Sequence, residues 1–540
     1  MAREEIKHLI EKAVKRLYKK PAIALAMAGK EVEVERSTKA IYGDYASNIA
    51  MVLKKNPQEI AKAIKPATEP LQEARGKKRI KFFSPILDKI EVRNGFINFF
   101  ISKEYLQKQV GEILKSKDEF GKLKIGKRQK VNIEFVSANP TGPLTLGNGR
   151  GGFCGDVLAN VLSTAGFNTE REYYINDTGE QVRKLGHSVL GDKEAVYRGK
   201  YIEDLNKRVE GKNAQEIGEK AAKIILKEMI KPTIKKMGIE FDTWFSEKNL
   251  YRKKETKKIL DFLRKKGLLY EKEGAIWFKS TEFGDDKDRV LIKADGEATY
   301  FLSDIVYLKN KFKRGFKILF FFWGADHFGY VNRIKAAVKA LSFDEENVRI
   351  VIMQLVRLIR QGKEVKMAKR TGTYVTLDDL IDEVSLDVAR FFFLSRSPDT
   401  HLNFDLDLAK EQSEKNPVYY VQYAHARICS ILRKRKTKNE KLKTTTKNLK
   451  LLNHPSELGL IKQIIRFPEI VEDTAKDYQV QRLPQYATDL ATTFHQFYRD
   501  CRVISGDENL IQARLCLVLV AKSVLKNTLN LMGISAPEKM

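Results

Sequence analysis

The stretch that decides the fold is SANPTGPLTLGNGRGG, residues 137–152, which lies between the apolar run VNIEFV and the segment FCGDVLANVLSTAG. A helical stripe that ends at Gly166 follows it and consists of Phe153, Val157, Leu158, Val161 and Leu162. A second extended run, TEREYYIND, comes after this helix. Strand, glycine-rich loop, helix and strand in this order predict a βαβ unit of a parallel sheet.

Two polar segments suit phosphate chemistry. In the first, GNGRGG, glycines without Cβ atoms and the free N–H groups of a helix start would let a phosphate approach the backbone. The second, KEVKMAKRTG, carries Lys363, Lys366, Lys369 and Arg370, and mobile cations suit a departing pyrophosphate. Taken alone, a ligand-free tight turn and a basic surface loop are the alternatives.

Composition points to a large soluble protein with an anionic partner. A chain of 540 residues exceeds the roughly 250–300 that one core supports, so about three domains are expected. Lys and Arg number 99 against 70 Asp and Glu, a net charge of +29. Nucleic acid is the partner that such an excess favours, and a basic solvated surface is the alternative.

The cysteines and the apolar runs indicate a reducing compartment. The four cysteines, Cys154, Cys429, Cys501 and Cys516, are scattered without metal-ligand spacing, so we expect no protein-bound zinc. Apolar runs such as ILFFFW are far shorter than the ~20 residues that cross a bilayer. We therefore expect a cytoplasmic protein that makes no contact with a membrane.

The pattern along the chain predicts three domains. Residues 1–105 read as a small α/β unit, and residues 125–407 as a Rossmann-type parallel-sheet domain with an insertion at about 190–290. Residues 408–540 read as amphipathic helices. Within them, residues 433–450 are strongly basic and are either a solvated loop or a phosphate-contacting one.

Several motifs together resemble one family. SANPTGPLTLGN is similar to the His-x-Gly-His loop of class I aminoacyl-tRNA synthetases, and KMAKR is similar to their Lys-Met-Ser-Lys-Ser loop. EFVSANPTGPL, YYINDTGEQ, FDTWFSE, DGEATYFLSDI, WGADHFGY and NPVYYVQYAHAR resemble the arginyl-tRNA synthetases in order. The resemblance covers essentially all of the chain. It implies an N-terminal domain that contacts tRNA, a class I catalytic domain and a helical anticodon-binding domain.

The resemblance also implies an activity and its partners. The enzyme would join L-arginine to ATP, giving arginyl-adenylate and pyrophosphate, and would then transfer arginine to the terminal ribose of its tRNA. Mg²⁺ would arrive with ATP, and the family generally needs bound tRNA for the first step. A monomer is expected on the same ground.

Site residues follow from the motifs, position by position. The guanidinium would be held by Glu247, Asp304 and Tyr300, and the α-amino group by Ser137 and Asn139. A solvated charge is the alternative for Glu247, and a helix N-cap for Asp304. The predicted ATP contacts are Gly147, Gly149, Gly324, Asp326, His327, Met367 and Lys369, and the predicted catalytic residues are Thr145, Asn148, Lys366 and Lys369. His327 has a packed structural histidine as its alternative.

The signature loop departs from the family pattern at two positions. Thr145 and Asn148 stand where the family has histidines. Losing one transition-state donor costs roughly 2.7–4 kcal/mol, so two silent positions would cost about 5–8 kcal/mol. Thr hydroxyl and Asn amide are both donors and stay neutral, so we expect them to replace the histidines and to add no ionisation to the pH–rate profile.

Two other functions remain as alternatives. A catalytically inactive synthetase-like tRNA-binding protein would explain the missing histidines, but it would need neither KMAKR nor the two carboxylates. Another class I specificity is disfavoured by the set of Glu247, Tyr300 and Asp304.

Overall fold

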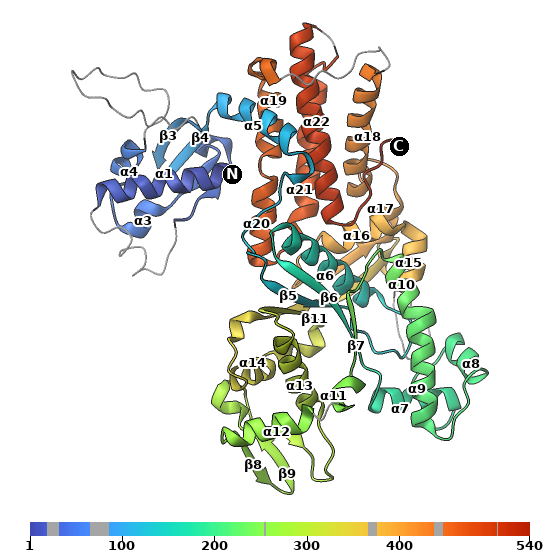
Figure 1. Ribbon diagram of the computed structural model, residues 1–540. Helices are drawn as coiled ribbons and strands as arrows, with labels where there is room; N and C mark the ends of the chain where they lie inside the picture. Colours follow the sequence, from blue (N-terminus) through green and yellow to red (C-terminus); the bar gives the residue numbers. More distant parts are fainter. Residues whose placement is uncertain (19–31, 65–85, 253–254, 366–374, 437–445, 505) are drawn as a thin grey trace.

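The structure is a computed structural model that describes residues 1–18, 32–64, 86–252, 255–365, 375–436, 446–504 and 506–540. Figure 1 shows a small N-terminal unit set to one side, a central sheet with helices, and a bundle of long helices that ends the chain. The predicted fold class, a Rossmann-type parallel-sheet domain between a small α/β unit and an all-helical part, is confirmed.

The central sheet has five parallel strands in the order β12-β11-β5-β6-β7. Their bounds are Lys130–Glu134 (β5), Asn168–Ile175 (β6), Thr243–Ser246 (β7), Ile318–Gly324 (β11) and Val348–Met353 (β12). Two of them, β5 and β6, are the runs on either side of the glycine-rich loop and helix, and β11 and β12 are the apolar runs ILFFFWG and VRIVIM. The exception is β7, whose four half-buried residues, TWFS, are too few to form a recognisable apolar run.

The order of the strands positions the functional site. The chain builds outward from β5 through β6 to β7, and then on the other side through β11 to β12. This is a doubly wound sheet, in which ligands bind at the carboxyl ends of the strands where the winding changes direction. The change falls between β5 and β11, which pair from Val131 with Ile318 to Glu134 with Phe321.

Helix α6 (Leu146–Thr164) begins inside the glycine-rich stretch, before the predicted start at Phe153. Glycine is a poor helix former, so the sequence alone predicts a loop through Gly152. Tertiary packing reverses that preference. A Cβ on Gly155 would lie 2.4 Å from the ring of Phe135 in the chain leaving β5, and one on Gly152 would lie 2.5 Å from Met237. The glycines therefore let α6 lie close against the sheet.

The insertion predicted at about 190–290 is not one piece, because β7 returns to the sheet within it. The first excursion, between β6 and β7, is helical: α7 (Glu180–Leu190), α8 (Lys200–Asn206), α9 (Ala214–Ile225) and α10 (Lys231–Lys236). The second combines helices with an antiparallel sheet: α11 (Lys248–Arg252), α12 (Glu255–Lys265), β8 (Leu269–Lys272), β9 (Ala275–Phe278) and β10 (Arg289–Ile292). Figure 1 shows the two excursions on either side below the sheet.

Helices and a small sheet complete the central region. Helix α13 (Tyr300–Lys313) leads into β11, and α14 (Val331–Ala340) leads from it toward β12. The small sheet has the strand order β14-β13-β15. The remaining elements are β13 (Val356–Arg360), β14 (Lys363–Glu364), α15 (Leu377–Val384), α16 (Leu386–Leu394), β15 (Leu402–Asp405) and α17 (Leu406–Lys410).

The N-terminal unit is an antiparallel sheet in the order β1-β2-β4-β3 with helices against it. A turn joins β3 to β4 at Asn94 and Gly95, whose φ angles of 51° and 81° suit a two-residue hairpin. Ile6, Ile10 and Val14 of the first helix are buried. The elements are α1 (Ala2–Leu17), β1 (Glu35–Arg36), β2 (Tyr45–Ser47), α3 (Ile49–Leu53), α4 (Pro57–Ala63), β3 (Leu87–Arg93) and β4 (Phe96–Ile101).

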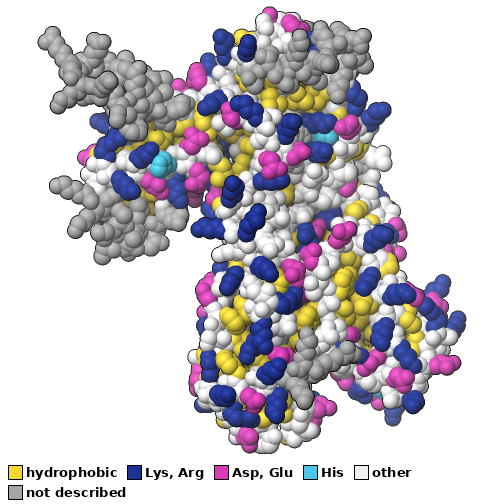
Figure 2. Space-filling model, in the orientation of Figure 1, with side chains coloured by type: hydrophobic (Ala, Val, Ile, Leu, Met, Phe, Trp, Pro, Cys, Tyr) yellow, Lys and Arg dark blue, Asp and Glu magenta, His cyan; other side chains and the backbone are white. Residues whose placement is uncertain are grey.

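The C-terminal part is helical: α18 (Pro417–Lys436), α19 (Pro455–Ile464), α20 (Phe467–Asp477), α21 (Arg482–Asp500) and α22 (Glu508–Leu531). Helix α5 (Lys103–Ser116) packs on α19 and α22 and joins the N-terminal unit to them. Figure 2 shows Lys and Arg side chains spread over the visible face. The predicted domain limits at residues 105 and 407 fall in α5 and α17, and the division stays a prediction. No described helix is long and apolar enough to cross a membrane.

Two glycines of α6 test the close packing. Gly155→Ala should destabilise the protein by about 1–3 kcal/mol, because its methyl group would overlap the Phe135 ring. Gly151→Ala should stabilise it by about 0.5–1 kcal/mol, since nothing lies within 4 Å of that Cβ position and alanine favours a helix. Urea unfolding followed by circular dichroism measures both, and equal effects would contradict the packing argument.

Candidate active site

A cavity of about 820 Å³ lies at the carboxyl ends of the central strands. Its walls come from the segments that follow β5, β6, β7 and β11, together with α13. The predicted site residues that line it are Ser137, Asn139, Thr145, Gly147, Asn148, Glu247, Tyr300, Asp304, Gly324, Asp326 and His327. The sheet thus brings together residues that are far apart in the sequence.

Of the predicted site residues that the structure describes, Gly149 is not part of this lining. Gly149 is buried one position further along α6, where a Cβ would lie 2.6 Å from Leu377, so packing accounts for this glycine and its contact with ATP stays a prediction. Lys366, Met367 and Lys369 lie outside the described residues. The chain just after them is anchored to the signature loop, because the Leu377 N–H donates to the Leu144 carbonyl at 3.0 Å.

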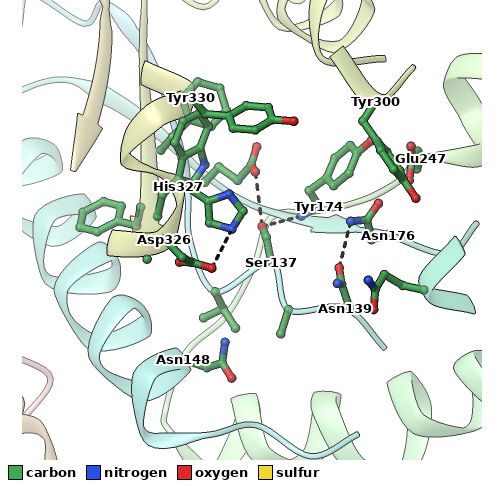
Figure 3. A pocket seen from close by; sticks show the side chains of 18 of the residues that line it. Ser137, Asn139, Asn148, Tyr174, Asn176, Glu247, Tyr300, Asp326, His327 and Tyr330 are labelled. Atoms are coloured by element: carbon green, nitrogen blue, oxygen red, sulfur yellow. Dashed lines mark hydrogen bonds and ion pairs between the residues drawn. The ribbon is translucent and has the colours of Figure 1, made fainter. Parts of the chain in front are cut away.

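The loop after β5 has an unusual backbone. Val136 and Ser137 have φ angles of 65° and 37°, which side-chain-bearing residues seldom adopt. The Ser137 hydroxyl accepts from the Tyr174 N–H at 3.1 Å and lies 3.5 Å from Glu134 (Figure 3). The Asn176 amide donates to Asn139 at 2.9 Å. Contacts from β6 and the segment after it therefore hold this strained loop in the cavity.

Three carboxylates converge at one end of the cavity: Glu134 at the end of β5, Glu247 after β7, and Asp304 in α13. The alternatives considered for two of them are wrong. Glu247 is only 1% exposed, so it is not a solvated surface charge. Asp304 is not an N-cap, because Thr299 caps α13 and Asp304 lies inside the helix.

The electrostatics of this acidic end favour a cation. Burial, followed by the charges of Glu247 and Glu134, raises the pKa of Asp304 to about 7, against the opposing effect of Arg333. A carboxyl whose pKa is raised by neighbouring like charges is strongly stabilised in its ionised form by a positively charged ligand, since such a ligand offsets the repulsion. The arrangement suits a cationic group that can face more than one carboxylate.

Tyr300 connects the two excursions across the mouth of the cavity. Its side chain is 51% exposed, and its hydroxyl accepts from the Glu180 N–H at the start of α7 at 3.3 Å. Gly179 has a φ of 79°, and a Cβ there would lie 3.0 Å from the Tyr300 hydroxyl. Figure 3 shows Tyr300 beside Glu247. The hydroxyl proton of Tyr300 therefore stays available for a ligand.

Thr145 and Asn148 form one capping unit at the start of α6. The Asn148 Oδ1 accepts from the Thr145 N–H at 2.9 Å and from the Thr145 hydroxyl at 2.8 Å. The Thr145 hydroxyl proton is thus used inside the loop. The Asn148 amide nitrogen points into the cavity (Figure 3), so the two side chains do not act alike: Asn148 offers a donor and Thr145 orients it.

The turn after β11 forms another wall of the cavity. Gly324 ends the strand, and a Cβ on it would lie 2.5 Å from the Asp326 carboxylate. His327 is 56% exposed and lies 3.6 Å from Asp326. The packed-histidine alternative is therefore wrong, and contact of His327 with a nucleotide stays a prediction.

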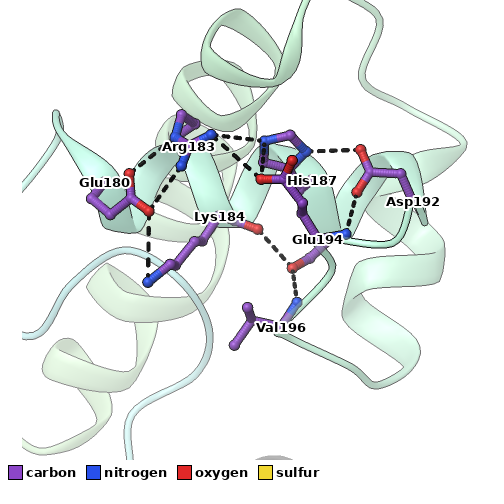
Figure 4. A network of polar contacts seen from close by, with 8 residues as sticks. Glu180, Arg183, Lys184, His187, Asp192, Glu194 and Val196 are labelled. Carbon is purple, nitrogen blue, oxygen red and sulfur yellow. Dashed lines mark hydrogen bonds and ion pairs between the residues drawn. The ribbon is translucent and has the colours of Figure 1, made fainter.

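A polar network fastens α7 to the loop that follows it (Figure 4). His187 Nδ1 lies 2.8 Å from Asp192, and its Nε2 lies 3.3 Å from Glu194. The Ser188 hydroxyl accepts from the Tyr197 N–H at 2.9 Å. The network fixes the loop so that Tyr197 lies in the wall of the cavity.

Several lining residues were missed by motif reasoning: Glu134, Tyr174, Asn176, Gln181, Tyr197 and Tyr307. The first four stand inside quoted motifs, EFVSANPTGPL and YYINDTGEQ, so position next to a predicted residue was the available signal. Tyr307 had a periodic signal only, because it lies three residues beyond Asp304 on the same helix face.

Comparison with known proteins identifies the family. Models of known families match three parts of the chain: an arginyl tRNA synthetase N terminal domain at residues 4–101, a tRNA synthetases class I (R) catalytic domain at 192–405, and a DALR anticodon binding domain at 421–540. The arginine–tRNA ligase of Caldanaerobacter subterraneus subsp. tengcongensis is 43% identical over 568 residues, with 100% of this chain and 99% of that protein covered.

A second relative and a solved structure agree. The arginine–tRNA ligase of Staphylococcus aureus strain USA300 is 40% identical, with 99% of each chain covered. The structure of the Thermus thermophilus arginyl-tRNA synthetase has the same fold, with a TM-score of 0.77 over 100% of both chains at 22% identity. With identity of this level along its full length, the chain belongs to the arginyl-tRNA synthetase family of class I aminoacyl-tRNA ligases.

Proposed function

We propose that the cavity activates L-arginine with ATP and transfers it to the 3′-terminal ribose of its tRNA. The observation that carries this proposal is the presence, in one cavity, of an acidic end with Glu247 and Asp304 and a phosphate-suited end with Gly147 and Asn148. The first suits a large cation and the second suits a nucleotide. An inactive tRNA-binding protein would need neither end.

Arginine would lie with its guanidinium at the acidic end. A guanidinium is planar, always charged and presents several N–H donors, so it can face Glu247 and Asp304 together. Tyr300 would add a hydrogen bond from its free hydroxyl proton. Lysine would be rejected, because one compact ammonium cannot satisfy two carboxylates that are arranged for a planar fork. The α-amino group would lie by Ser137 and Asn139, close to Glu134.

ATP would lie along the start of α6. Among the described residues, the Thr145 hydroxyl, at 3.8 Å, is the one group within 4 Å of the Gly147 Cβ position outside the helix's own backbone, so a phosphate can approach this backbone. Adenosine would follow the turn of Gly324, Asp326 and His327. Lys366 and Lys369, with Met367, would approach from outside the described residues. Mg²⁺ would arrive bound to the phosphates of ATP.

The chemistry has two steps. A carboxylate oxygen of arginine attacks the α-phosphorus of ATP, an acyl-phosphate bond forms and pyrophosphate leaves. A hydroxyl of the terminal tRNA ribose then attacks the carbonyl carbon, and AMP leaves. In the first step the Asn148 amide and the lysines would meet charge that develops on the phosphates, and the carboxylates would hold the substrate in line.

Asp304→Asn tests the guanidinium site. The variant should bind arginine about 3–5 kcal/mol more weakly at pH 8, at least about 100-fold in Kd, because it leaves half of the cation unpaired. Wild-type affinity should fall about tenfold per unit below pH 7, since proton uptake by Asp304 opposes binding of a cation, and the variant should lose this slope. Calorimetric titration at several pH values measures both. Arginine affinity within threefold of wild type would refute the assignment.

The same variant should be more stable than the wild type. The pKa of Asp304 is raised in the folded state, so its contribution to stability is present below pH 4 and is lost as the pH rises through about 7. Asp304→Asn should therefore raise the melting temperature most at pH 8, and the gain should shrink as the pH falls from 7 toward 4, where the wild-type carboxyl is protonated in both the folded and the unfolded state. A lower melting temperature at pH 8 would show that Asp304 is a structural residue instead.

Asn148→Asp and Thr145→Val separate the two residues of the capping unit. Asn148→Asp keeps the acceptor for the Thr145 N–H but aims an anion at the phosphates, so adenylate formation should fall about 100–1000-fold. Thr145→Val should cost about 0.5–2 kcal/mol of stability and less than about tenfold in rate, because its hydroxyl is used within the loop. Equal rate losses in tRNA-dependent pyrophosphate exchange would show that Thr145 also donates to ATP.

Pyrophosphate exchange with arginine, with and without tRNA, tests the activity as a whole. Exchange with arginine but not with lysine is expected, together with a strong dependence on tRNA. Exchange that is absent in both conditions, with tRNA still bound, would support an inactive tRNA-binding protein. A monomeric state and a cytoplasmic location are expectations that follow from the family.

A further inference from the structure

A fully buried cation lies directly behind the acidic end of the cavity. Lys311 of α13 is 0% exposed, and its Nζ lies 2.8 Å from Glu134 Oε2 and 3.0 Å from Glu172 Oε1. It also donates to Asn132 of β5. The Tyr307 hydroxyl lies 2.8 Å from the same Glu134 Oε2 and also contacts Glu172. Both α13 side chains thus reach the same two carboxylates.

The sheet creates the need for this cation. Glu134 and Glu172 stand opposite each other in the register of β5 and β6, where two like charges repel. Glu172 is fully buried, and Glu134 nearly so. Burial alone would raise the pKa of Glu172, but Lys311, Arg314 and Tyr307 lower it to about 2. Glu172 therefore stays ionised because Lys311, Arg314 and Tyr307 surround it.

One face of α13 joins this buried cluster to the substrate end. Tyr300, Asp304, Tyr307 and Lys311 follow one another at steps of four, three and four residues, which places them in a single stripe. Tyr300, Asp304 and Tyr307 line the cavity, as does Glu134. The helix that carries two predicted arginine contacts is thus fixed to the sheet by the same ion cluster that holds Glu134.

Glu134 is the link between the two layers. Its Oε2 is engaged from behind by Lys311 and Tyr307, while its Oε1 lies 3.5 Å from the Ser137 hydroxyl on the cavity side. Its charge also acts on Asp304, which is faced by Glu247 after β7, by Arg333 of α14 and by Glu134 itself. A change in the groups that neutralise the charge of Glu134 therefore affects the sites for both the α-ammonium group and the guanidinium group of bound arginine.

We propose that Lys311 and Tyr307 are positioning residues of the arginine site, which aim the cavity-side oxygen of Glu134, Oε1, at the α-ammonium group and set the charge that the guanidinium meets at Asp304. The inference rests on the proposed function. Lys311 is sealed off from the cavity by the carboxylate that it holds, whereas Tyr307 lies in the cavity wall and acts through its hydrogen bond to Glu134.

Tyr307→Phe is the first test, because it keeps the ring in place and removes only the hydroxyl. Arginine Kd at pH 8 should rise about tenfold, while ATP affinity stays within twofold. The pH at which arginine binding weakens should move upward, because Glu134 is then less compensated and repels the ionised form of Asp304 more strongly. Calorimetric titration of the full chain with arginine and with ATP, from pH 5.5 to 8.5, gives both readouts.

A double variant tests Lys311 while keeping the net charge of the buried cluster unchanged. Lys311→Met with Glu172→Gln removes one cation and one anion and keeps Arg314 beside Glu170. It should shift the pH midpoint further upward than Tyr307→Phe and raise arginine Kd about 30-fold or more. Its control is Arg514→Met with Glu457→Gln, a pair at 2.7 Å in which Glu457 is 1% exposed, within the C-terminal helices. The control should leave arginine Kd and its pH midpoint unchanged.

The outcomes separate the inference from the function on which it rests. If wild type binds arginine and both test variants bind it with unchanged Kd and pH midpoint, Lys311 and Tyr307 serve the fold alone and the inference is overturned. The same follows if the control shifts the midpoint as far as the double variant does. If wild type fails to bind arginine at any pH, the proposed function itself is wrong.

Discussion

The structure depends on bringing several carboxylates together at the carboxyl ends of the central strands. Glu134, Glu247 and Asp304 share one cavity, and Glu172 lies behind Glu134. Without nearby positive charges, buried carboxylates so close together would not all remain ionised. Lys311 and Arg314 lie against the inner carboxylates, whereas burial and then the charges of Glu247 and Glu134 keep the pKa of Asp304 raised against the opposing effect of Arg333. The cavity thus keeps an excess of negative charge that a cationic substrate would neutralise. That excess is the source of the proposed specificity.

The winding of the sheet explains how residues that are distant in sequence meet at the acidic end of the cavity. Strand β5 lies at the centre, with β6 and β7 on one side and β11 on the other, so four chain segments leave the sheet along the same edge. Each supplies one component: the strained loop at Ser137, the contact from Asn176, the carboxylate of Glu247 and the turn at Gly324. The excursions between the strands then close the sides, through Tyr197 and Tyr300. The site is therefore a consequence of topology, and the side chains adapt it to one ligand.

Local sequence predicted the parts of this plan that local physics controls. The runs at β11 and β12 are largely apolar, those at β5 and β6 stand on either side of a glycine-rich loop and a helix, and the Asn94–Gly95 turn has a strong conformational preference. The helical residues Gly147–Gly152 and the short strand β7 could not be predicted, because contacts with Phe135, Met237 and neighbouring strands override weak propensities. Motifs named most of the cavity residues, but the burial of Lys311 and its pairing with two carboxylates depend on the register of β5 with β6, which one sequence does not reveal.

The departure at the signature loop has a physical reading once the capping unit is considered. Two histidines could each offer a ring donor to ATP, whereas here the Thr145 hydroxyl and N–H both turn to Asn148 Oδ1. This fixes the remaining amide donor in one direction and removes the freedom of the Asn148 side chain in advance of binding. The N–H groups at the start of α6 supply further donors in the same direction. A single preorganised amide beside a helix N-terminus can therefore replace part of what two ionisable rings contribute, without adding a titration near neutral pH.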